Sequence, residues 1–370
     1  MTESQTNIQT APEPQMARSA DGAPEPQFKR VHIIVNPASG QDRPVLSILN
    51  EVFHPSGIDW EVFVTKQAGD AVRYAREAVA AGVDAVGVYG GDGTVMEVAS
   101  ALVNTNMPLA IFPGGTANVM SVELGVPSDP AEACALVTGG RSTIRSIDVG
   151  QYGDHIFLTR LGMGLESNVI ENTAREQKDR MGWLAYALNT LRELADPKVS
   201  RYRLTLDGEV VETEGLTCVV ANSGIITPNS GIPGRGVVSF APGISVSDGL
   251  LDVVVIRGAD LGSLLSVAAS MMAGNENAEP LLHWTAREVL VEADPPQTIQ
   301  LDGEILDQTP AHARVIPNAL RVIVPPAAVP PTPTAEDFEA KGQGPLATSP
   351  AEGAPSDRTA PSAPALQSMS

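Results

Sequence analysis

The stretch VGVYGGDGTVMEVASAL, residues 86–102, decides the fold class of this chain. It opens with an apolar run of the kind found in buried parallel strands, turns at glycines 90, 91 and 93, and continues with helical spacing. Glycines let the backbone turn tightly and approach a phosphate closely. The first turn of a following helix then presents free N–H groups to that anion. The stretch therefore predicts a strand, a phosphate-binding turn and a helix.

The same alternation of apolar runs and helical patterns extends on both sides of this stretch. Alternating strands and helices with short links imply right-handed crossovers and a parallel sheet. The predicted strands are residues 31–35, 60–65, 83–89 and 109–112, and the predicted helices are residues 45–53, 70–81, 94–103 and 118–124.

From about residue 147 the pattern changes to short segments rich in Val, Thr, Ile and Leu between Gly, Asp, Asn and Pro turns, which is typical of antiparallel strands. Two helical segments, 183–194 and 261–272, interrupt it, and the apolar run 320–324 is expected to return to the first domain. The fold class is therefore α/β, with an N-terminal parallel-sheet nucleotide-binding domain followed by a C-terminal antiparallel β-sandwich domain. The strand-like segments are residues 151–158, 202–206, 217–222, 251–256, 288–292 and 298–301.

Both ends of the chain differ in composition from the middle. Residues 1–28 are rich in Pro, Gln, Ala and Thr, and residues 325–370 are rich in Pro, Ala, Gly, Ser and acids. Neither segment can bury enough apolar surface to offset the entropy lost on ordering. We therefore predict two disordered tails around an α/β domain at residues 29–146 and a sandwich domain at residues 147–324.

Composition argues against several classes of protein. No apolar stretch reaches the roughly 18 residues of a membrane-spanning helix, and the first residues lack the basic-then-apolar order of a signal peptide. The two cysteines, Cys134 and Cys218, lack metal-ligand spacing, which favours a cytoplasmic protein. A net charge of −20 argues against nucleic acid and against a basic surface docking on anionic membranes. Any membrane contact is expected to be transient, peripheral at the inner face and largely apolar.

The GGDGT turn, residues 90–94, carries the first candidate site residues. Asp92 would be repelled by phosphates unless a divalent metal or a substrate hydroxyl lies between them, and phosphoryl transfer needs such a carboxylate. Thr94 and Glu97 have the spacing of a capping box, which predicts that they fix the start of the helix. The alternative is a plain glycine turn in which Asp92 only begins the helix.

Two further turns follow predicted strands. The PGGTAN turn, residues 113–118, offers the Thr116 hydroxyl and the Asn118 amide, and the NPASG turn, residues 36–40, has small residues that would admit a nucleotide. At the carboxyl ends of strands in one parallel sheet, such turns line one crevice. Each of the two, taken alone, is also compatible with a routine loop.

These three motifs, in this order, resemble the catalytic domain shared by diacylglycerol kinases, sphingosine kinases and related bacterial lipid kinases, and the resemblance covers about residues 30–324. It implies an α/β nucleotide domain, a β-sandwich, and ATP between them. The implied ATP contacts are Asn36, Pro37, Ala38, Ser39, Gly40, Thr65, Gly91, Asp92, Gly93, Thr94, Val95, Met96, Glu97 and Thr116.

The segment SVSDGL, residues 245–250, resembles the magnesium loop of that family. The resemblance implies that Ser245, Asp248 and Leu250 hold Mg²⁺ through one carboxylate and backbone carbonyls, and oxygen ligands suit this metal. Without the resemblance, Asp-Gly between two strands is an ordinary turn.

The segment LDGE, residues 301–304, resembles a late motif of the family, in which Glu304 is the general base toward the lipid hydroxyl and Asp302 supports it. The same string occurs at residues 206–209, and we assign that copy to a structural hairpin because only the second follows the magnesium loop. Whether Asp92 or Glu304 takes the proton stays open at this stage.

The sequence thus predicts an ATP- and magnesium-dependent phosphotransferase that acts on the hydroxyl of a membrane lipid, diacylglycerol or a relative of it. A homodimer is compatible with this interpretation. After Asn118 the chain reads VMSV, residues 119–122, unlike the acidic or small residue and aromatic of many lipid kinases. The alternatives are an NAD kinase, which shares the GGDGT turn, and a nucleotide-binding regulator without catalysis. The presence of Asp92, Asp248 and Glu304 argues against the regulator.

Overall fold

The computed structural model describes residues 28–39, 43–139, 141–164, 199–227, 238–239, 243–257 and 281–326. Gly40, the predicted helices at 183–194 and 261–272 and, apart from residues 28, 325 and 326, both predicted tails lie outside these ranges. Every element described below belongs to one compact unit, which lies within Met1–Thr332.

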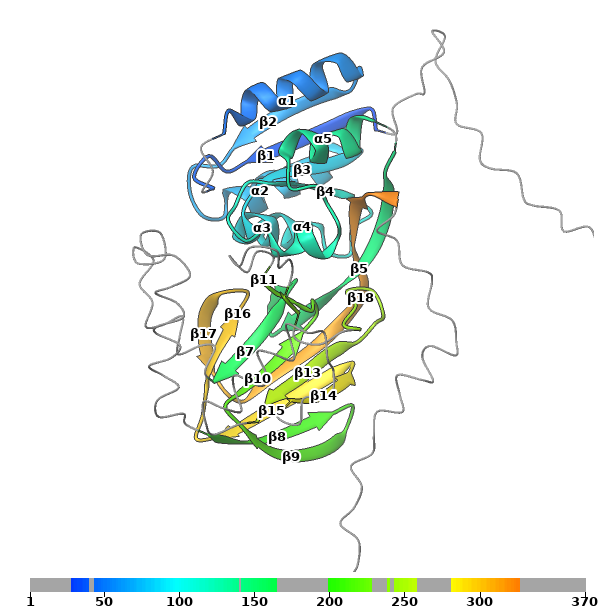
Figure 1. Cartoon of the computed structure of the whole chain (residues 1–370). Coiled ribbons are helices and arrows are strands. Elements are labelled where there is room, and N and C mark those ends of the chain that lie inside the picture. Colours follow the sequence, from blue (N-terminus) through cyan, green and yellow to red (C-terminus); the bar gives the residue numbers. More distant parts are fainter. Residues whose placement is uncertain are drawn as a thin grey trace, which may run out of the picture. The chain divides into compact units, whose positions relative to one another are not determined.

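Four parallel strands form one half of the main sheet, in the order β2-β1-β3-β4 (Figure 1). The chain moves from β1 to β2 in one direction and from β2 through β3 to β4 in the other. Because such crossovers are right-handed, α1 covers one face of the sheet, and α2 and α3 cover the other, where they pack together. The bounds are β1 Arg30–Val35, α1 Val45–Phe53, the 3-10 helix η1 His54–Ser56, β2 Asp59–Val64, α2 Asp70–Ala81, β3 Ala85–Gly90, α3 Asp92–Leu102, β4 Leu109–Pro113, α4 Val119–Glu123 and α5 Pro130–Thr138.

Helix α5 packs against α1 and is not among the elements predicted above. A local signal for it exists. Asp129 Oδ1 accepts hydrogen bonds from the N–H groups of Ala131 at 2.9 Å and Glu132 at 3.3 Å, and Pro130 fills the first helical position. An aspartate cap followed by proline is a favoured helix start, because proline has no N–H that needs a partner there.

The second half of the fold is antiparallel. A six-stranded sheet, in the order β14-β13-β10-β7-β16-β17, packs against the antiparallel part of the main sheet, which contains β8, β9, β15 and β18. Alternate residues point inward; in β8, for example, Tyr202 and Leu204 are buried while Arg201 and Arg203 are exposed. The bounds are β5 Thr143–Tyr152, β6 His155–Phe157, β7 Arg160–Gly164, β8 Ser200–Leu206, β9 Glu209–Gly215, β10 Thr217–Ala221, β11 Ile225–Thr227, β12 Val238–Ser239, β13 Leu251–Ile256, β14 Leu281–Ala286, β15 Glu288–Asp294, β16 Thr298–Leu301, β17 Glu304–Gln308 and β18 Ala311–Val324.

Strand β18 joins the parallel and antiparallel halves into one ten-stranded sheet (Figure 1). It pairs with β15 and β5 antiparallel, and at Val322 it pairs with Leu109 of β4 in parallel. The predicted return of residues 320–324 to the first domain is therefore confirmed, as is the α/β-plus-sandwich fold class. The predicted boundary between residues 146 and 147 stays a prediction, and β5 runs through that position without a break.

Replacing Leu320 by Ala tests whether the shared sheet makes the two halves unfold together. Leu320 is 1% exposed and lies in the core of the parallel half, so the cavity should cost about 2–5 kcal/mol. Trp60 reports on that core and Trp284 on the sandwich core. We expect denaturant transitions followed by each tryptophan, with the other two tryptophans replaced by Phe, to coincide before and after the change.

The control for this experiment is Leu46→Ala, at a position 56% exposed, which should leave both transitions in place. Separate midpoints for the two tryptophans would show that β18 does not couple the halves.

Candidate active site

The three predicted turns meet at the carboxyl ends of β1, β3 and β4. The order of the strands reverses between β1 and β3, and such a switch point opens a crevice where ligands bind. Asn36, just after β1, crosses this point: its Nδ2 donates to Thr94 Oγ1 at 2.8 Å, and its backbone N–H donates to the Tyr89 carbonyl at 2.9 Å. The Gly114 N–H donates to the Gly90 carbonyl at 2.9 Å. The turns therefore form one hydrogen-bonded surface.

Glycines allow two of these turns to touch directly. A Cβ atom on Gly115 would lie 2.5 Å from the Cα of Gly91, closer than real Cβ atoms come to backbone. A Cβ on Gly114 would lie 2.9 Å from both Ser39 Oγ and the Tyr89 ring. The GGDGT, PGGTAN and NPASG turns are thus packed to a spacing that only glycine permits at these positions.

Asn118 closes the PGGTAN turn on itself. Its side chain donates to the Gly115 carbonyl at 2.8 Å and accepts from the Gly115 N–H at 2.9 Å, and its own φ of 52° lies in the left-handed region that Asn tolerates. This leaves the predicted ATP contact Thr116 exposed at the tip. The predicted contact Thr65, after β2, is tied by its N–H to the Val35 carbonyl at 2.9 Å.

The predicted capping box is wrong. Helix α3 begins at Asp92, two residues before Thr94, with Gly91 at the cap position and no side chain bonded there. Thr94 Oγ1 accepts from Asn36, and Glu97 Oε2 accepts from the Gly69 N–H at 3.1 Å. Both side chains are instead hydrogen-bonded to residues far away in the sequence, so the start of α3 has no side-chain cap. An anion site at a helix start requires such uncapped N–H groups.

Asp92 stands between this helix start and the start of α4. Its Oδ1 accepts from the Val119 N–H at 2.7 Å. Burial raises the pKa of the Asp92 carboxyl, the charge of Asp302 raises it further, and backbone N–H groups of residues 118–120 partly offset both. A raised carboxyl pKa beside the glycine turn suits a residue that accepts a proton.

Asp302 approaches Asp92 from the sandwich. It begins the turn of the second LDGE hairpin, β16–β17, where Asp302 and Gly303 have φ of 44° and 99°. Its carboxylate accepts from the N–H groups of residues 158–160 at 2.9, 3.1 and 2.9 Å, and from the Thr159 hydroxyl. Asp302 therefore fixes its hairpin against the start of β7. Glu304, the first residue of β17, is exposed.

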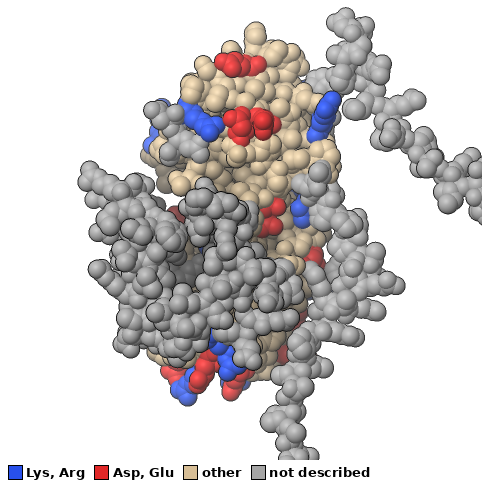
Figure 2. All heavy atoms as spheres, in the orientation of Figure 1, with Lys and Arg blue, Asp and Glu red and all other residues tan. Residues whose placement is uncertain are grey.

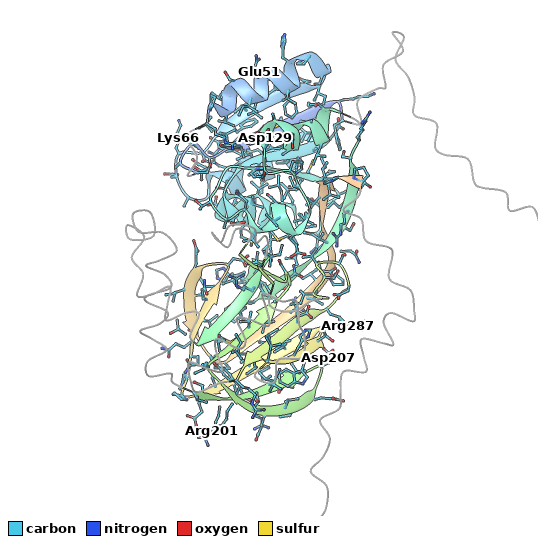
Figure 3. The ribbon with its side chains drawn as sticks, viewed as in Figure 1. Glu51, Lys66, Asp129, Arg201, Asp207 and Arg287 are labelled. Atoms are coloured by element: carbon cyan, nitrogen blue, oxygen red, sulfur yellow. The ribbon has the colours of Figure 1, made fainter. Side chains whose placement is uncertain are left out.

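In the first LDGE hairpin, β8–β9, an aspartate also accepts hydrogen bonds from the backbone of a neighbouring strand. Asp207 and Gly208 have φ of 49° and 92°, and Asp207 accepts from the N–H groups of Arg287 and Glu288 at 2.8–3.1 Å (Figure 3). The two copies are alike as hairpins, and Asp302 is the one whose charge reaches Asp92. The two copies therefore occupy different places in the fold, and the assignment of the first to structure and the second, with Glu304, to catalysis stays a prediction.

A second acid, which sequence reasoning missed, lies beside the predicted magnesium loop. Asp248 is 8% exposed, and its Oδ1 accepts from the Leu250 N–H at 3.1 Å. Beside it Asp148, fully buried in β5, accepts from the N–H groups of Gly249 at 2.6 Å and Asn318 at 2.7 Å. Burial raises the pKa of Asp148, and the charge of Asp248 raises it further. An acid inside the apolar run IDVG, residues 147–150, is the signal that marks it.

The oxygen donors of this loop fit Mg²⁺ as a site with one main carboxylate. The described residues hold no cluster of three or more His, Cys, Asp or Glu that could bind a metal. Besides burial, the charge of Asp248 raises the pKa of Asp148, and the Arg145 charge partly counteracts it; a divalent cation would offset the repulsion further. Ser245 and Leu250 would then contribute backbone oxygens, which remains a prediction.

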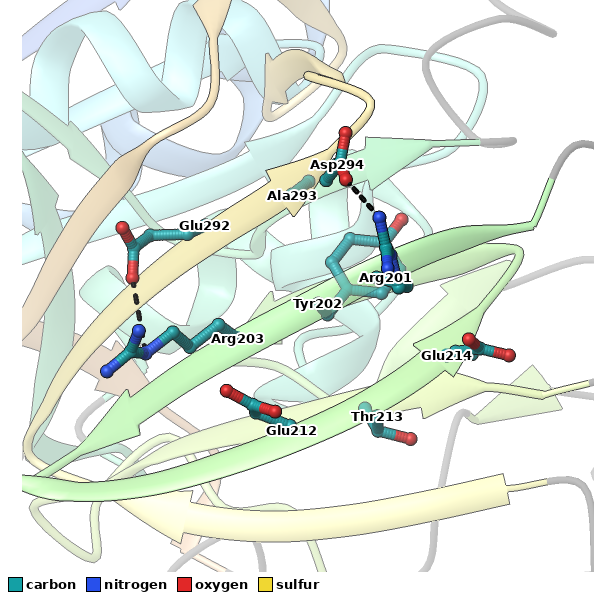
Figure 4. Close-up of a pocket in the computed structure, with 9 residues that line it drawn as sticks. All are labelled: Arg201, Tyr202, Arg203, Glu212, Thr213, Glu214, Glu292, Ala293 and Asp294. Atoms are coloured by element: carbon teal, nitrogen blue, oxygen red, sulfur yellow. Dashed lines mark hydrogen bonds and ion pairs between the residues drawn. The ribbon is translucent and has the colours of Figure 1, made fainter. Parts of the chain in front are cut away.

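A pocket of about 610 Å³ lies elsewhere, on the outer face of β15, β8 and β9, and none of the predicted site residues lines it (Figure 4). Across it, β8 arginines are paired with β15 acids: Arg201 with Asp294, and Arg203 with Glu292 at 3.8 Å. Glu214 and Glu212 of the edge strand β9 lie opposite the same two arginines. We interpret this ladder as structural, because charged side chains discourage further pairing at an exposed sheet edge.

This architecture defines a class: a nucleotide-type α/β half with a glycine-lined crevice, joined to a β-sandwich. Residues 30–152 match the family model described as diacylglycerol kinase catalytic domain, and residues 159–324 match the YegS C-terminal NAD kinase beta sandwich-like domain. The chain belongs to the diacylglycerol kinase-like lipid kinase family. No helix in the described part of the chain is long and apolar enough to cross a membrane.

Individual relatives cover most of both chains. The protein named "Diacylglycerol kinase" of Bacillus subtilis (strain 168) is 28% identical over 80% of this chain and 97% of its own. The "Probable lipid kinase YegS-like" of Klebsiella pneumoniae (strain 342) is 31% identical over 80% and 95%. A solved structure of a diacylglycerol kinase from Bacillus anthracis str. Sterne has a TM-score of 0.67 and 30% identity, covering 82% of this chain and 99% of that one.

Replacing Gly115 by Ala tests the contact between the turns. The added methyl group meets Gly91 backbone, and overpacking of this kind costs about 1–3 kcal/mol, so the Tm should fall. Gly93→Ala is the matched change, because its Cβ meets nothing within 4 Å and its Tm should hold. If phosphates bind at this turn, Gly93→Ala should still weaken ATP binding in calorimetry. An unchanged Tm for Gly115→Ala would contradict the packing described here.

Replacing Asp92 by Asn tests the environment of its carboxyl. Because burial raises the pKa of Asp92, the stability it contributes is present below the pKa of the unfolded chain, about 3.9, and is lost as pH rises through the higher folded pKa. Asn keeps an oxygen for the Val119 N–H and carries no charge. We expect the Tm of Asp92→Asn to match wild type at acid pH and to exceed it by a few degrees at neutral pH.

The exposed Glu51 on α1 (Figure 3), changed to Gln, is the control for this pH series. Its Tm difference from wild type should stay small throughout. A neutral-pH Tm lower than wild type for Asp92→Asn would mean that the surroundings of Asp92 favour its charged form.

Proposed function

We propose that this protein is an ATP-dependent lipid kinase that transfers the γ-phosphate of ATP to the hydroxyl of a membrane lipid such as diacylglycerol. The observation that supports the proposal is the glycine-lined crevice where the three turns meet, with the buried carboxylate of Asp92 at the uncapped start of α3. Membership of the lipid kinase family supports the reaction type.

ATP would bind with its phosphates at the GGDGT turn. The α3 N-terminus supplies N–H groups and a partial positive charge, and Gly93, where an added Cβ would meet nothing within 4 Å, leaves room for a phosphate to approach the backbone. The exposed Thr116 hydroxyl lies at the rim of the same surface. Mg²⁺, held by Asp248 with Ser245 and Leu250, would supply charge neutralisation for the phosphoryl group.

The transfer needs one proton acceptor. The lipid oxygen bonds to the γ-phosphorus, the bond from that phosphorus to the bridging oxygen breaks, the hydroxyl proton passes to a carboxylate, and ADP leaves. Glu304 is our candidate for that carboxylate, because it is exposed on the hairpin that Asp302 fixes beside Asp92. Asp92, held by the Val119 N–H, would assist.

The lipid would reach the site over the edge strand β17. Ile305 and Leu306, directly after Glu304, are 44% and 37% exposed. A register shift in β16–β17 leaves Leu306 without a partner on β16, and such bulges re-aim side chains next to active sites. The face in Figure 2 shows basic groups in small separate sets with acids beside some of them. With a net charge of −20, this favours an apolar and transient membrane contact.

Phosphate transfer from labelled ATP into a panel of lipids in detergent, with NAD in the same panel, tests the proposal. Label should appear in an extractable lipid. Glu304→Gln should lower kcat roughly 10²–10⁴-fold, the usual contribution of a general base. Glu209→Gln, the matched residue of the first LDGE hairpin, should leave kcat near wild type.

Label in NADP would overturn the lipid assignment in favour of an NAD kinase. ATP binding without transfer to any acceptor would favour a non-catalytic regulator. Equal effects of the two glutamine variants would remove Glu304 from the mechanism.

A further inference from the structure

Helix α4 connects the crevice to the sandwich. It has five residues, Val119–Glu123, and so short a helix is not stable by itself. Its first N–H, on Val119, donates to Asp92. Its last residue, Glu123, accepts from the Ser223 hydroxyl of the sandwich, and Ser223 Oγ in turn accepts from the Ile225 N–H at 3.3 Å. Both ends of α4 are therefore held by groups outside the helix.

Glu123 is an unfavourable residue for the local structure. A carboxylate in the last turn of a helix opposes the helix dipole. Burial raises the pKa of Glu123, and the Ser223 hydroxyl, backbone N–H groups of residues 224 and 225, and the Arg145 charge counteract that rise. A residue that costs stability locally and gains a hydroxyl and backbone N–H groups from the sandwich is best explained by the link that it makes.

Ser223 continues the link toward the second LDGE hairpin. The N–H groups of Asn222 and Ser223 donate to the Thr159 carbonyl at 2.8 and 3.1 Å. The Asn222 side chain donates to the Leu158 carbonyl at 2.9 Å. The N–H of Thr159 and its hydroxyl then donate to Asp302. Both Asn222 and Ser223 are fully buried, so water does not compete for these bonds.

The bonds form one path between the two candidate catalytic carboxylates. It runs from Asp92 through α4 to Glu123, then to Ser223 and Thr159, and ends at the Asp302 turn that carries Glu304. We propose that Glu123 and Ser223 are positioning residues, which clamp α4 to the sandwich and so set the separation of Asp92 and Glu304. This inference rests on the proposed kinase reaction, and neither residue needs to touch a substrate.

The test compares kcat, the KM for ATP and amide hydrogen exchange in Ser223→Ala and Glu123→Ala. Each change breaks the path at a hydrogen bond to a charged group, so kcat should fall on the order of 10- to 100-fold. The KM for ATP should change little, because the glycine turns keep their own bonds. Exchange should rise at the amides of Val119 and of residues 158–160. Glu123→Gln, which still accepts from Ser223, should rescue most of the kcat lost in Glu123→Ala.

Thr217→Val is the matched control. It also removes a buried hydroxyl that donates to a carbonyl, that of Met163 at 2.8 Å, but it lies off the path. It should lower the Tm without lowering kcat. If Ser223→Ala behaves like Thr217→Val, with a lower Tm, normal kcat and unchanged exchange at residues 158–160, the clamp is only structural and the inference is overturned.

Failure of the proposed function would look different. If wild type phosphorylates no lipid, the exchange experiment alone decides the clamp: faster exchange at residues 158–160 in Ser223→Ala supports it, and unchanged exchange overturns it.

Discussion

Hydrogen bonds from backbone N–H groups to aspartate carboxylates hold the turns of this protein in place. The chain has 44 acids and 24 Lys and Arg residues, so nearly half of the acids cannot have a Lys or Arg partner of their own. Asp84 accepts from the N–H groups of Lys29 and Arg30 before β1, and Asp70 accepts from those of residues 66 and 67 before α2. Asp148, Asp207 and Asp302 bind turns of the sandwich in the same way. Such bonds are strong because one partner is charged.

This way of building the fold has a consequence at the site. Burial raises the pKa of Asp92, and the charge of Asp302 raises it further, while backbone donors hold both carboxylates in place. The arrangement costs stability, as functional sites commonly do. Among the described residues, Asp92 has a backbone N–H donor and no arginine or lysine in a salt bridge, so the carboxylate stays available for a proton or a metal-bound phosphate.

The sequence alone predicts those features of the fold that residues close together in the chain determine. Strand and helix positions in the parallel half follow from periodicity, and α2 spans the predicted residues 70–81. The predicted start of α3 is wrong because the Thr94 hydroxyl accepts a hydrogen bond from Asn36, which is 58 residues away in the sequence. Asp148 was missed because its hydrogen-bond donors, the N–H groups of Gly249 and Asn318, are brought to it only in the folded chain. The same holds for the candidate site: its motifs can be recognised in the sequence, whereas the contacts between the motifs depend on tertiary packing.

The two LDGE hairpins show most clearly the limit of prediction from local sequence, since the same four residues form closely similar turns in both places. What differs is the register beyond the turn. In β8–β9 the pairing from Ser200 to Glu209 runs without a shift, whereas in β16–β17 it shifts between Ile299 and Gln300. A regular strand alternates its side chains between core and solvent, so Val211 packs toward the sandwich core behind Val210. The bulge breaks that alternation and exposes both Ile305 and Leu306 beside Glu304. One inserted residue thus gives the second hairpin two exposed apolar side chains after its glutamate, where the first has only Val210.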